Sequence, residues 1–330
     1  MDLSIVIVNW NSVDFLRSCL KTIYEHTAGV EFEVVVIDNA SYDGSAEMLE
    51  REYPDAVFLQ GSHNLGFSTA NNLAYQYAKS STILFLNPDT ELLNDAITKM
   101  YTHLHSRPEI GAVGCRLVNS DLSVQTRYVQ AFPTLWNQIL RSDLLIRLFP
   151  KARLWGCRPL FFFGELPAEV EVVSGSCVMV KRDVFEKIGH FDEDYFMYAE
   201  DVALCHAIRR AEYSIHFVGE GSMIHHGAKS STSKKENHFA SIMQRESLAL
   251  FFQKTRSNLY ASLYKASVAV TALFRLTLIT MVLPFEAMFS KGERFAAAGR
   301  KWVKILRWSL GLEQWATAAR PGMPKRASGY

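Results

Sequence analysis

The sequence predicts an α/β fold, with a mostly parallel central sheet, flanking helices and a helical C-terminal extension. Residues 3–9, 33–39 and 82–86 are runs rich in Val, Ile, Leu and Phe, typical of strands covered on both faces. Segments with helical spacing separate these runs, as in right-handed strand–helix–strand crossovers. Each run also ends on polar residues, at the edge where open α/β sheets bind their ligands.

The remaining elements continue this alternation. The predicted helices cover residues 13–26, 45–53 and 94–106, and the further strands cover 56–59, 111–118 and 171–180. Gly175 interrupts the last of these strands, and its missing side chain permits a ligand or another strand to approach closely. Between residues 119 and 167 the chain is irregular and rich in aromatics, which is typical of a lid or binding loop, although packing on the body is the ordinary role of such aromatics.

Two carboxylates close strands of the predicted sheet. Asp38 ends one run, and Asp89 follows another, where Pro88 cannot donate to the sheet and so ends the strand. We predict that the two acids lie at equivalent ends of neighbouring strands and that Asp89 faces a ligand. The alternative interpretation of Asn87–Thr90 is a simple turn after a strand.

The loop from Asn64 to Asn72 is a candidate ligand loop. Gly66 lets the backbone adopt positive φ or pass close to a ligand, and Ser68 is expected to cap the following helix, whose free amides could meet a phosphate or a polar base. A loop that merely precedes a helix is the alternative. After the first strand, Asn9–Ser12 replaces the Gly-x-Gly-x-x-Gly of dinucleotide-binding folds, which disfavours a nicotinamide cofactor.

Further carboxylates lie among aromatics at the start of a predicted helix. Glu200 and Asp201 fall in its first turn, where the helix dipole favours negative charge, so helix capping is one interpretation. The other is catalysis, because desolvation by aromatic neighbours raises the pKa of a carboxyl group towards that of a general base. His225 and His226 follow a short predicted strand at 214–218, and an isolated histidine pair is more often structural.

Composition and charge indicate a globular protein with a basic tail. The 330 residues are 48% hydrophobic and 21% charged, with a formal net charge of +1. Residues 254–330 carry 13 Lys and Arg against three acids, so this tail has a net charge of +10 and the remainder −9, which predicts attachment to an anionic surface. The five cysteines are scattered and lack a Cys-x-x-Cys pair, which favours a reducing compartment over a disulfide scaffold or zinc cluster. The amino terminus shows no secretory signal.

The tail alternates apolar blocks with charges. Lys265 and Arg275 divide residues 258–289, so no apolar run reaches the ~18 to 20 residues of a membrane span. Among its basic residues stand three tryptophans, Trp302, Trp308 and Trp315. We therefore expect helices that lie in an anionic membrane interface, with attachment weakened by salt. Packing of these helices on the body or in an oligomer contact is the alternative.

Eight short motifs occur in a specific order and spacing. They are residues 4–11 (SIVIVNWN), 36–39 (VIDN), 64–67 (NLGF), 87–89 (NPD), 175–176 (GS), 191–193 (FDE), 196–202 (FMYAEDV) and 225–227 (HHG). In these motifs the sequence resembles family 2 glycosyltransferases with the GT-A fold, most closely the bacterial rhamnosyltransferase-like branch. The resemblance covers roughly residues 3 to 250.

The resemblance implies transfer of a sugar, best matched by L-rhamnose from dTDP-rhamnose, to an acceptor hydroxyl with inversion at the anomeric carbon. Asp89 stands where the family has its metal-coordinating acid, and His225 resembles a further metal or diphosphate contact. Asp201 resembles the catalytic base, with Glu200 beside it. The residues implied in nucleotide-sugar binding are Asn9, Asp38 (on the base), Asn64, Gly66, Asn87, Gly175 and Arg127.

The same resemblance implies a Mg²⁺ or Mn²⁺ cofactor, which would stabilise the departing diphosphate electrostatically. It implies a dTDP- or UDP-linked donor and a polyprenyl-linked or oligosaccharide acceptor in cell-surface polysaccharide synthesis. The expected location is the cytoplasmic face of the membrane, where the protein would attach peripherally. No nucleic-acid partner is expected, and a homo-oligomer is possible. The expected divisions are a nucleotide-sugar-binding half at 1–115, an acceptor and catalytic half at 116–253, and basic amphipathic helices at 254–330.

Three positions depart from the family pattern. Asn87 replaces an acid found in many metal-binding relatives, Ala203 replaces an acid after Glu-Asp-Val, and Leu122 replaces the glycine of an Asp-Gly turn. Asn87 and Ala203 motivate a second hypothesis, a catalytically impaired nucleotide-sugar-binding scaffold at the membrane. A nucleotidyltransferase is disfavoured, because no Gly-rich, basic triphosphate loop follows the first strand.

Overall fold

The computed structural model describes residues 1–125, 129–139, 167–227, 238–287 and 292–318. The chain forms two compact units. The first, called here the sheet unit, comprises residues 1–132, 144–193 and 200–232, and the second, the helical unit, comprises 133–143, 194–199 and 233–330. The predicted division at residues 115 and 253 stays a prediction.

The sheet unit is built on a nine-stranded, mixed sheet, which confirms the predicted α/β class. The strand order is β3-β2-β1-β4-β10-β6-β11-β5, and β8 pairs with β11. β1 (Leu3–Asn9) is parallel to β2 (Phe32–Asp38) on one side and to β4 (Thr82–Leu86) on the other. β3 (Val57–Gln60) continues the parallel arrangement beyond β2. The apolar side chains of β1 and β4 are almost fully buried, as their Ile- and Leu-rich runs predict.

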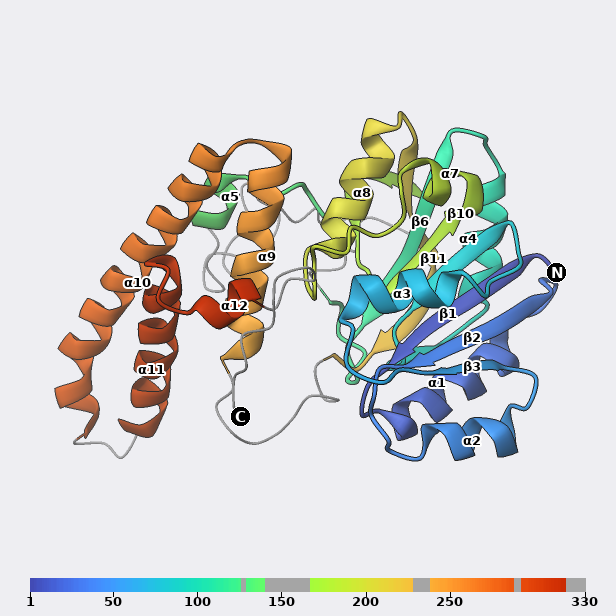
Figure 1. The fold of residues 1–330 in the computed structure, drawn as a ribbon, viewed down its shortest axis with the longest axis horizontal. Helices are drawn as coiled ribbons and strands as arrows, with labels where there is room; N and C mark the ends of the chain where they lie inside the picture. Colours follow the sequence, from blue (N-terminus) through green and yellow to red (C-terminus); the bar gives the residue numbers. More distant parts are fainter. Residues whose placement is uncertain (126–128, 140–166, 228–237, 288–291, 319–330) are drawn as a thin grey trace. The chain divides into compact units, whose positions relative to one another are not determined.

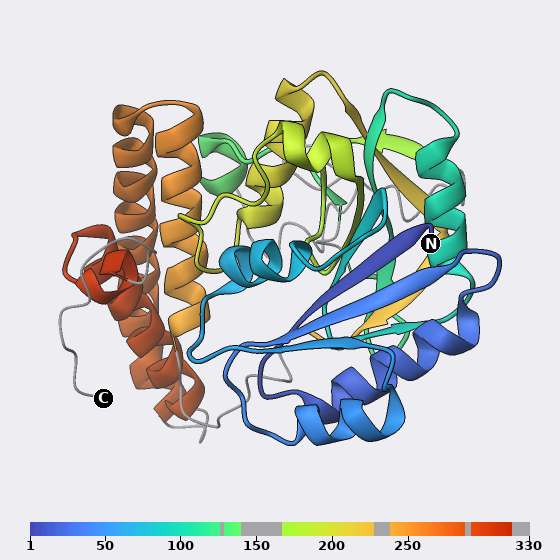
Figure 2. The same ribbon diagram turned by 45° about the vertical axis from the view of Figure 1, so that its right-hand side comes forward.

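Three helices connect these strands. They are α1 (Val13–His26), α2 (Ser45–Glu52) and α3 (Phe67–Tyr75). Figures 1 and 2 show α1 and α2 on one face of strands β1 to β3 and α3 on the other. The change of face follows from right-handed crossovers, because after β3 the chain reverses direction across the sheet and returns to β4 on the far side of β1. The carboxyl ends of β1 and β4 therefore lie at a topological switch point, where such sheets bind ligands.

The other half of the sheet contains antiparallel pairs. β10 (Cys177–Lys181) runs antiparallel between β4 and β6 (Ile110–Val118), and β11 (Ser214–His225) lies parallel to β6 and antiparallel to β5 (Thr90–Leu92). The smaller pairs use β8 (Ala168–Val170), β7 (Val129–Gln130) and β9 (Val172–Val173). The helices of this half are α4 (Ala96–His105), α7 (Arg182–Lys187) and α8 (Glu200–Arg210).

Three sequence predictions are wrong in detail. Asp38 and Asp89 do not follow neighbouring strands, because β1 lies between β2 and β4. The strand predicted at 214–218 continues to His225, since a register shift between Val218 and Ser222 lets β11 resume its pairing with β6. Ser68 does not cap α3: Gly66 precedes the helix with φ +80°, and the buried hydroxyl of Ser68, one residue inside, has no hydrogen-bond partner among the described residues. The positive φ predicted for Gly66 is confirmed.

The helical unit contains α5 (Leu135–Ile139), α9 (Phe239–Thr255), α10 (Asn258–Ala287), α11 (Gly292–Ser309) and α12 (Gln314–Ala318). α10 packs along both α9 and α11, as Figures 1 and 2 show. Two of the three tryptophans of the tail form hydrogen bonds within the helical unit, and the expected membrane interface stays a prediction. Trp308 is 2% exposed and donates a hydrogen bond to Glu246 of α9, and Trp315 donates one to Glu313.

Candidate active site

Asp38, at the end of β2, is the centre of a buried hydrogen-bond network. Its carboxylate accepts bonds from Asn9 Nδ2 (2.8 Å), Gln60 Nε2 (2.8 Å) and the Ser41 amide (2.8 Å), and a further bond from the Ser41 hydroxyl. Burial opposes ionisation, but the bonds from Ser41, Gln60 and Asn9 outweigh it and hold the pKa of Asp38 below its ordinary value. Because these donors occupy both oxygens, a nucleotide base that binds Asp38 must exchange with one of them.

Asn9 lies directly opposite Asp38 in the parallel register of β1 and β2. Its amide donates to Ser45 as well as to Asp38, and its Oδ1 accepts a bond from the Ser12 hydroxyl at 2.7 Å. The side-chain amide nitrogen thus joins β1 to the end of β2 and the start of α2, while the side-chain oxygen holds the loop that follows β1. This fully buried asparagine shapes the predicted base pocket rather than lining it with a free group.

The loop at Asn64 and Gly66 is tied to the same sheet edge by Asn39. Asn39 Nδ2 donates to Asn64 Oδ1 (2.9 Å) and to the Gly66 carbonyl (3.2 Å), while Asn39 Oδ1 accepts the Leu65 amide at 2.8 Å. Asn64 Oδ1 also accepts the Gly66 amide. The structure thereby brings two predicted groups, the end of β2 and the 64–67 loop, to one place.

Asp89 and His225 meet on the other side of β1, past the end of β4. His225 Nε2 lies 3.4 Å from Asp89 Oδ1, and both side chains are largely buried. Gln125 donates to the His225 carbonyl, which turns its Oε1 towards His225 Nδ1 at 3.0 Å, so Nδ1 carries the proton of the ring. The Nε2 lone pair of a neutral ring then faces the Asp89 carboxylate, so both groups present acceptors to the same space.

The Gly175–Ser176 turn links this pair to the start of α8. Ser176 Oγ lies 3.3 Å from His225 Nε2 and 3.4 Å from Asn87 Nδ2, and the Asn87 amide donates to the Ser176 carbonyl. The amide of Gly175 donates to Asp201 Oδ2 at 3.0 Å. The missing side chain of Gly175 was predicted to permit close approach of a ligand or another strand, and the group that approaches is Asp201.

Glu200, which is buried, and Asp201, which is half-buried, form a pair of carboxyl groups at the start of α8. Burial, followed by the neighbouring Asp201, raises the pKa of Glu200 to about 8, and Glu200 Oε2 has no hydrogen-bond partner within the described residues. Burial also raises the pKa of Asp201, but the amides of Gly175 and Val202 oppose that rise. Glu200 is therefore protonated at neutral pH, and the two backbone amides favour the ionised form of Asp201, so Asp201 is the better placed of the two to accept a proton.

The backbone before α8 is strained. Tyr198 and Ala199 both adopt positive φ, at 69° and 61°, which is uncommon for residues with a side chain. Such strain is retained where the surroundings determine the conformation, often at functional sites. Tyr198 and Ala199 immediately precede Glu200, the first residue of α8.

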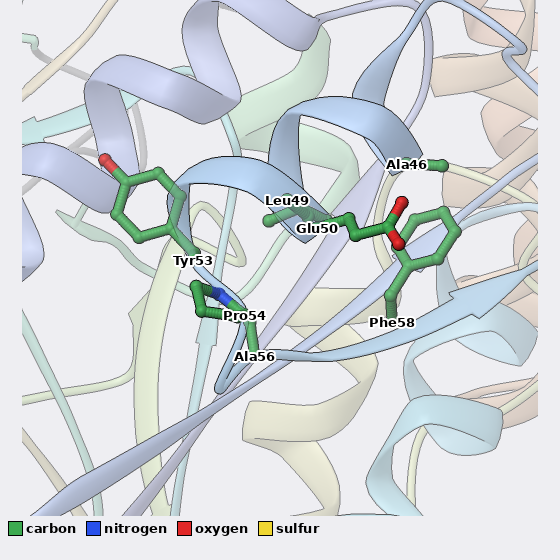
Figure 3. A pocket seen from close by; sticks show the side chains of 7 residues that line it. All are labelled: Ala46, Leu49, Glu50, Tyr53, Pro54, Ala56 and Phe58. Carbon is green, nitrogen blue, oxygen red and sulfur yellow. The ribbon is translucent and has the colours of Figure 1, made fainter.

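Other candidates lie elsewhere. His226 is held by Glu91 and Ser120 at 2.9 Å each, which is a structural role. The hollow in Figure 3, about 290 Å³, is lined by residues of α2 and β3 and their connection and includes none of the predicted site residues. Arg127 lies outside the described residues. Three residues that complete the networks, namely Ser41, Gln60 and Gln125, were not predicted, and Ser176 was noted only as part of the Gly175–Ser176 motif. Only the positions of the first three near the motifs could have indicated them.

Asp89 and His225 are the described residues that would hold a divalent cation. Asp89 and His225 converge, but no group of three or more His, Cys, Asp or Glu suited to a metal occurs in the described part of the chain. A hard divalent cation such as Mg²⁺ needs only one or two protein carboxylates when substrate phosphates supply further oxygens, and Mn²⁺ also accepts imidazole. The pair therefore fits a cation that is completed by a diphosphate.

Comparison with known proteins identifies the family. The model described as "Glycosyl transferase family 2" matches residues 4–189, more than half of the chain. The chain belongs to glycosyl transferase family 2. A hexosyltransferase of low-salt glycan biosynthesis from Haloferax volcanii is 30% identical over 219 residues, which cover 65% of this chain and 64% of that protein. The N-acetylglucosaminyl-diphospho-decaprenol L-rhamnosyltransferase of Mycobacterium tuberculosis is 30% identical over 224 residues, 63% of this chain and 70% of that protein.

These relatives confirm the resemblance to the rhamnosyltransferase-like branch of glycosyl transferase family 2. The rhamnosyltransferase WbbL of Escherichia coli supports the same branch. It is 25% identical to this chain, over 67% of this chain and 82% of its own length. Among solved structures, a mannosyltransferase from Pyrobaculum calidifontis in complex with GDP-Man and Mn²⁺ has a TM-score of 0.55 at 16% identity, over 96% of this chain and 85% of that one. That likeness confirms the predicted GT-A-type fold.

Proposed function

We propose that this protein is an inverting glycosyltransferase that moves a sugar from a dTDP- or UDP-linked donor to an acceptor hydroxyl. L-Rhamnose is the sugar that the relatives favour, since two of them are named rhamnosyltransferases. The observation that carries the proposal is the Gly175–Ser176 turn, because one short segment contacts His225 of the proposed diphosphate site and Asp201, the proposed base.

In the proposed reaction the acceptor oxygen attacks the anomeric carbon while the bond to the nucleoside diphosphate breaks. Asp201 takes the proton of the acceptor hydroxyl, and the leaving diphosphate keeps the electron pair of the broken bond. No covalent nucleophile is needed. Protonated Glu200 leaves the negative charge on Asp201, where the amides of Gly175 and Val202 orient it.

The nucleotide end is proposed to bind where Asp38, Asn9 and the 64–67 loop converge. Asp89 and His225 would hold a Mg²⁺ or Mn²⁺ ion, which when bound supplies positive charge to the diphosphate oxygens. Asn87 leaves this site with one carboxylate, so cation affinity is expected to depend on the nucleotide. The remaining proposed donor contacts are Gly175, at the turn, and Arg127.

The acceptor is proposed to be polyprenyl-linked, by analogy with the decaprenol-linked acceptor in the name of the mycobacterial relative. An oligosaccharide acceptor is the other possibility from the family resemblance. A polyprenyl acceptor requires a membrane location, so we also propose peripheral attachment at the cytoplasmic face.

A transfer assay with Asp201→Asn tests this function. The isosteric amide cannot take a proton, so kcat is expected to fall by about 10²- to 10⁴-fold, while binding of the nucleoside diphosphate in calorimetry stays unchanged. Asp55→Asn, at an exposed loop position, removes the same charge and should leave kcat unaltered. Normal turnover by Asp201→Asn would refute the assigned base.

The second candidate is the impaired scaffold, motivated by Asn87 and Ala203. It predicts that the unaltered protein binds nucleoside diphosphates but transfers and hydrolyses none of the candidate nucleotide-sugars. A screen of dTDP- and UDP-sugars by thermal shift, with and without Mg²⁺ or Mn²⁺, followed by transfer assays, separates the two candidates.

A further inference from the structure

One face of α10 is apolar, exposed and free of charge. Six of its large side chains are between 50% and 69% exposed, namely Leu259, Leu263, Val270, Leu273, Phe274 and Met281. They form a stripe, called here the outer face of α10, that extends about 33 Å along the helix at 1.5 Å per residue. Single exposed apolar residues are ordinary in globular proteins, but a contiguous stripe of this length marks an interaction site.

The two charges that divide this segment in the sequence point to the opposite face of the helix. Lys265 Nζ lies 5.4 Å from the ring centre of Trp308 and 3.9 Å from Glu246, and Arg275 lies over the ring of Trp302 at 4.7 Å. Lys265 and Arg275 therefore belong to the packing of α10 against α9 and α11. From Asn258 to Met281 no exposed residue of the helix is charged.

Two exposed threonines of α10 are hydrogen-bonded within their own helix. Thr277 donates its hydroxyl hydrogen to the Leu273 carbonyl at 3.0 Å, and Thr280 donates to the Thr277 carbonyl at 2.8 Å. Such bonds within the helix matter where water is absent, because every polar hydrogen must then find a protein acceptor. The outer face of α10 therefore fits an environment without water better than a hydrated surface.

Residues 258–281 also meet the length and hydropathy expected of a membrane helix, although only 17% of the window is buried in the structure. A core helix of a globular protein is mostly buried, so the usual alternative for such a segment does not apply. The net charge of +10 on residues 254–330 complements the anionic headgroups that border a bilayer. Length, missing charge and surrounding basic residues thus favour lipid over a protein partner.

We propose that the outer face of α10 enters the acyl-chain layer of one leaflet of an anionic bilayer, with the helix lying in the plane of the membrane. The in-plane orientation follows from α11, which packs along α10 and exposes Lys304 and Arg307. A hairpin that crossed the bilayer would carry these charges into the hydrocarbon. The dominant force is burial of apolar surface, so attachment resists salt, in contrast to the salt-weakened attachment predicted from the sequence.

This inference adds a specific surface to the proposed membrane location, and its test needs no turnover. The full-length protein is mixed with vesicles of phosphatidylglycerol and phosphatidylethanolamine and floated through a density gradient at about 0.1 M and about 1 M salt. The unaltered protein and Asp201→Asn are expected to float at both salt concentrations. The double variant Val270→Glu with Phe274→Glu is expected to lose at least ~90% of the floated fraction at both, because it brings charge to the outer face.

The matched control is Leu73→Glu with Leu93→Glu, two exposed leucines of the sheet unit that change the net charge equally. It should float like the unaltered protein, and circular dichroism should show the same helix content in both double variants. Release of the unaltered protein at about 1 M salt would assign attachment to electrostatics and overturn the proposal. If the Val270→Glu, Phe274→Glu variant floats as well as the unaltered protein, the proposal is also overturned. The same holds if light scattering shows that the unaltered protein is a dimer and this variant a monomer, because the outer face of α10 would then join two copies.

Discussion

The amide of Gly175 donates a hydrogen bond to Asp201 Oδ2 at 3.0 Å, and a Cβ atom built at residue 175 would lie 3.1 Å from the Cβ of Asp201. The bond favours the ionised form of this half-buried carboxyl group, and the missing side chain lets the carboxyl group approach its donor. In the proposed enzyme this contact orients the base and favours its ionised form. The next residue, Ser176, lies 3.3 Å from His225, so a shift of the Gly175–Ser176 turn would displace contacts to both Asp201 and His225.

Gly175→Ala tests the contact. The added methyl group requires Asp201 to move by a few tenths of an ångström, so kcat should fall while KM for the donor changes little, and the change in the free energy of unfolding should stay below ~1 kcal/mol. Steady-state kinetics and urea unfolding measure these quantities. Gly299→Ala in α11, whose added Cβ would meet only Ile279 at 3.9 Å, is the matched control and should not alter kcat. An unchanged kcat in Gly175→Ala would show that the base tolerates displacement.

Removal of the divalent cation tests the Asp89–His225 site. Chelation by EDTA is expected to abolish transfer, and Mn²⁺ or Mg²⁺ to restore it. His225→Ala should weaken Mn²⁺ binding in the presence of nucleoside diphosphate at least ~10-fold, measured by electron paramagnetic resonance, since the loss of even a supporting residue commonly costs that much. His226→Ala should leave Mn²⁺ affinity unchanged, because its ring is bonded to Glu91 and Ser120. Full activity in EDTA would refute the requirement for a divalent cation. The His225 imidazole would then be the proposed contact to the diphosphate.

Glu200 predicts a pH-dependent stability. Its pKa is raised from 4.5 to about 8 in the folded protein, so between these values the folded state holds a proton that the unfolded chain has released. The free energy of unfolding must therefore fall as pH rises from about 5 to about 8, by an amount on the order of a few kcal/mol. Glu200→Gln, which is neutral throughout, should lack this fall when urea unfolding is compared across that range. Parallel pH profiles for the two proteins would contradict the raised pKa.

Asn39→Ala tests the loop that joins the end of β2 to residues 64–67. The change leaves Asn64 Oδ1, the Leu65 amide and the Gly66 carbonyl without their Asn39 partner, so the free energy of unfolding should fall by about 1 to 3 kcal/mol. If this loop contacts the nucleotide, affinity for nucleoside diphosphate in calorimetry should also fall. Asn119→Ala, which breaks an exposed bond to Ser123, is the control and should change neither quantity appreciably. Unchanged nucleotide affinity in Asn39→Ala would show that the nucleotide base does not bind at this loop.

Much of the fold could be predicted from the sequence, because local patterns encode it. The apolar runs at β1, β2 and β4 are long enough to specify buried strands, and the helical spacing of α1 leaves little choice of element. Glu200 and Asp201 were expected in the first turn of a helix with raised pKa values, and both features are present in α8. Such inferences need only the residues themselves and their neighbours along the chain.

What local patterns cannot supply is which strands lie side by side and which side chains meet across the sheet. The sequence by itself determined the α/β class, the family motifs and the candidate acids. Only the tertiary structure decided that β1 separates Asp38 from Asp89 and that the amide of Gly175 donates a hydrogen bond to Asp201. It also decided that Lys265 and Arg275 pack against neighbouring helices, which leaves one face of α10 uncharged. The physical reason is that register, crossovers and helix rotation depend on contacts between residues far apart in the chain, which no single segment contains.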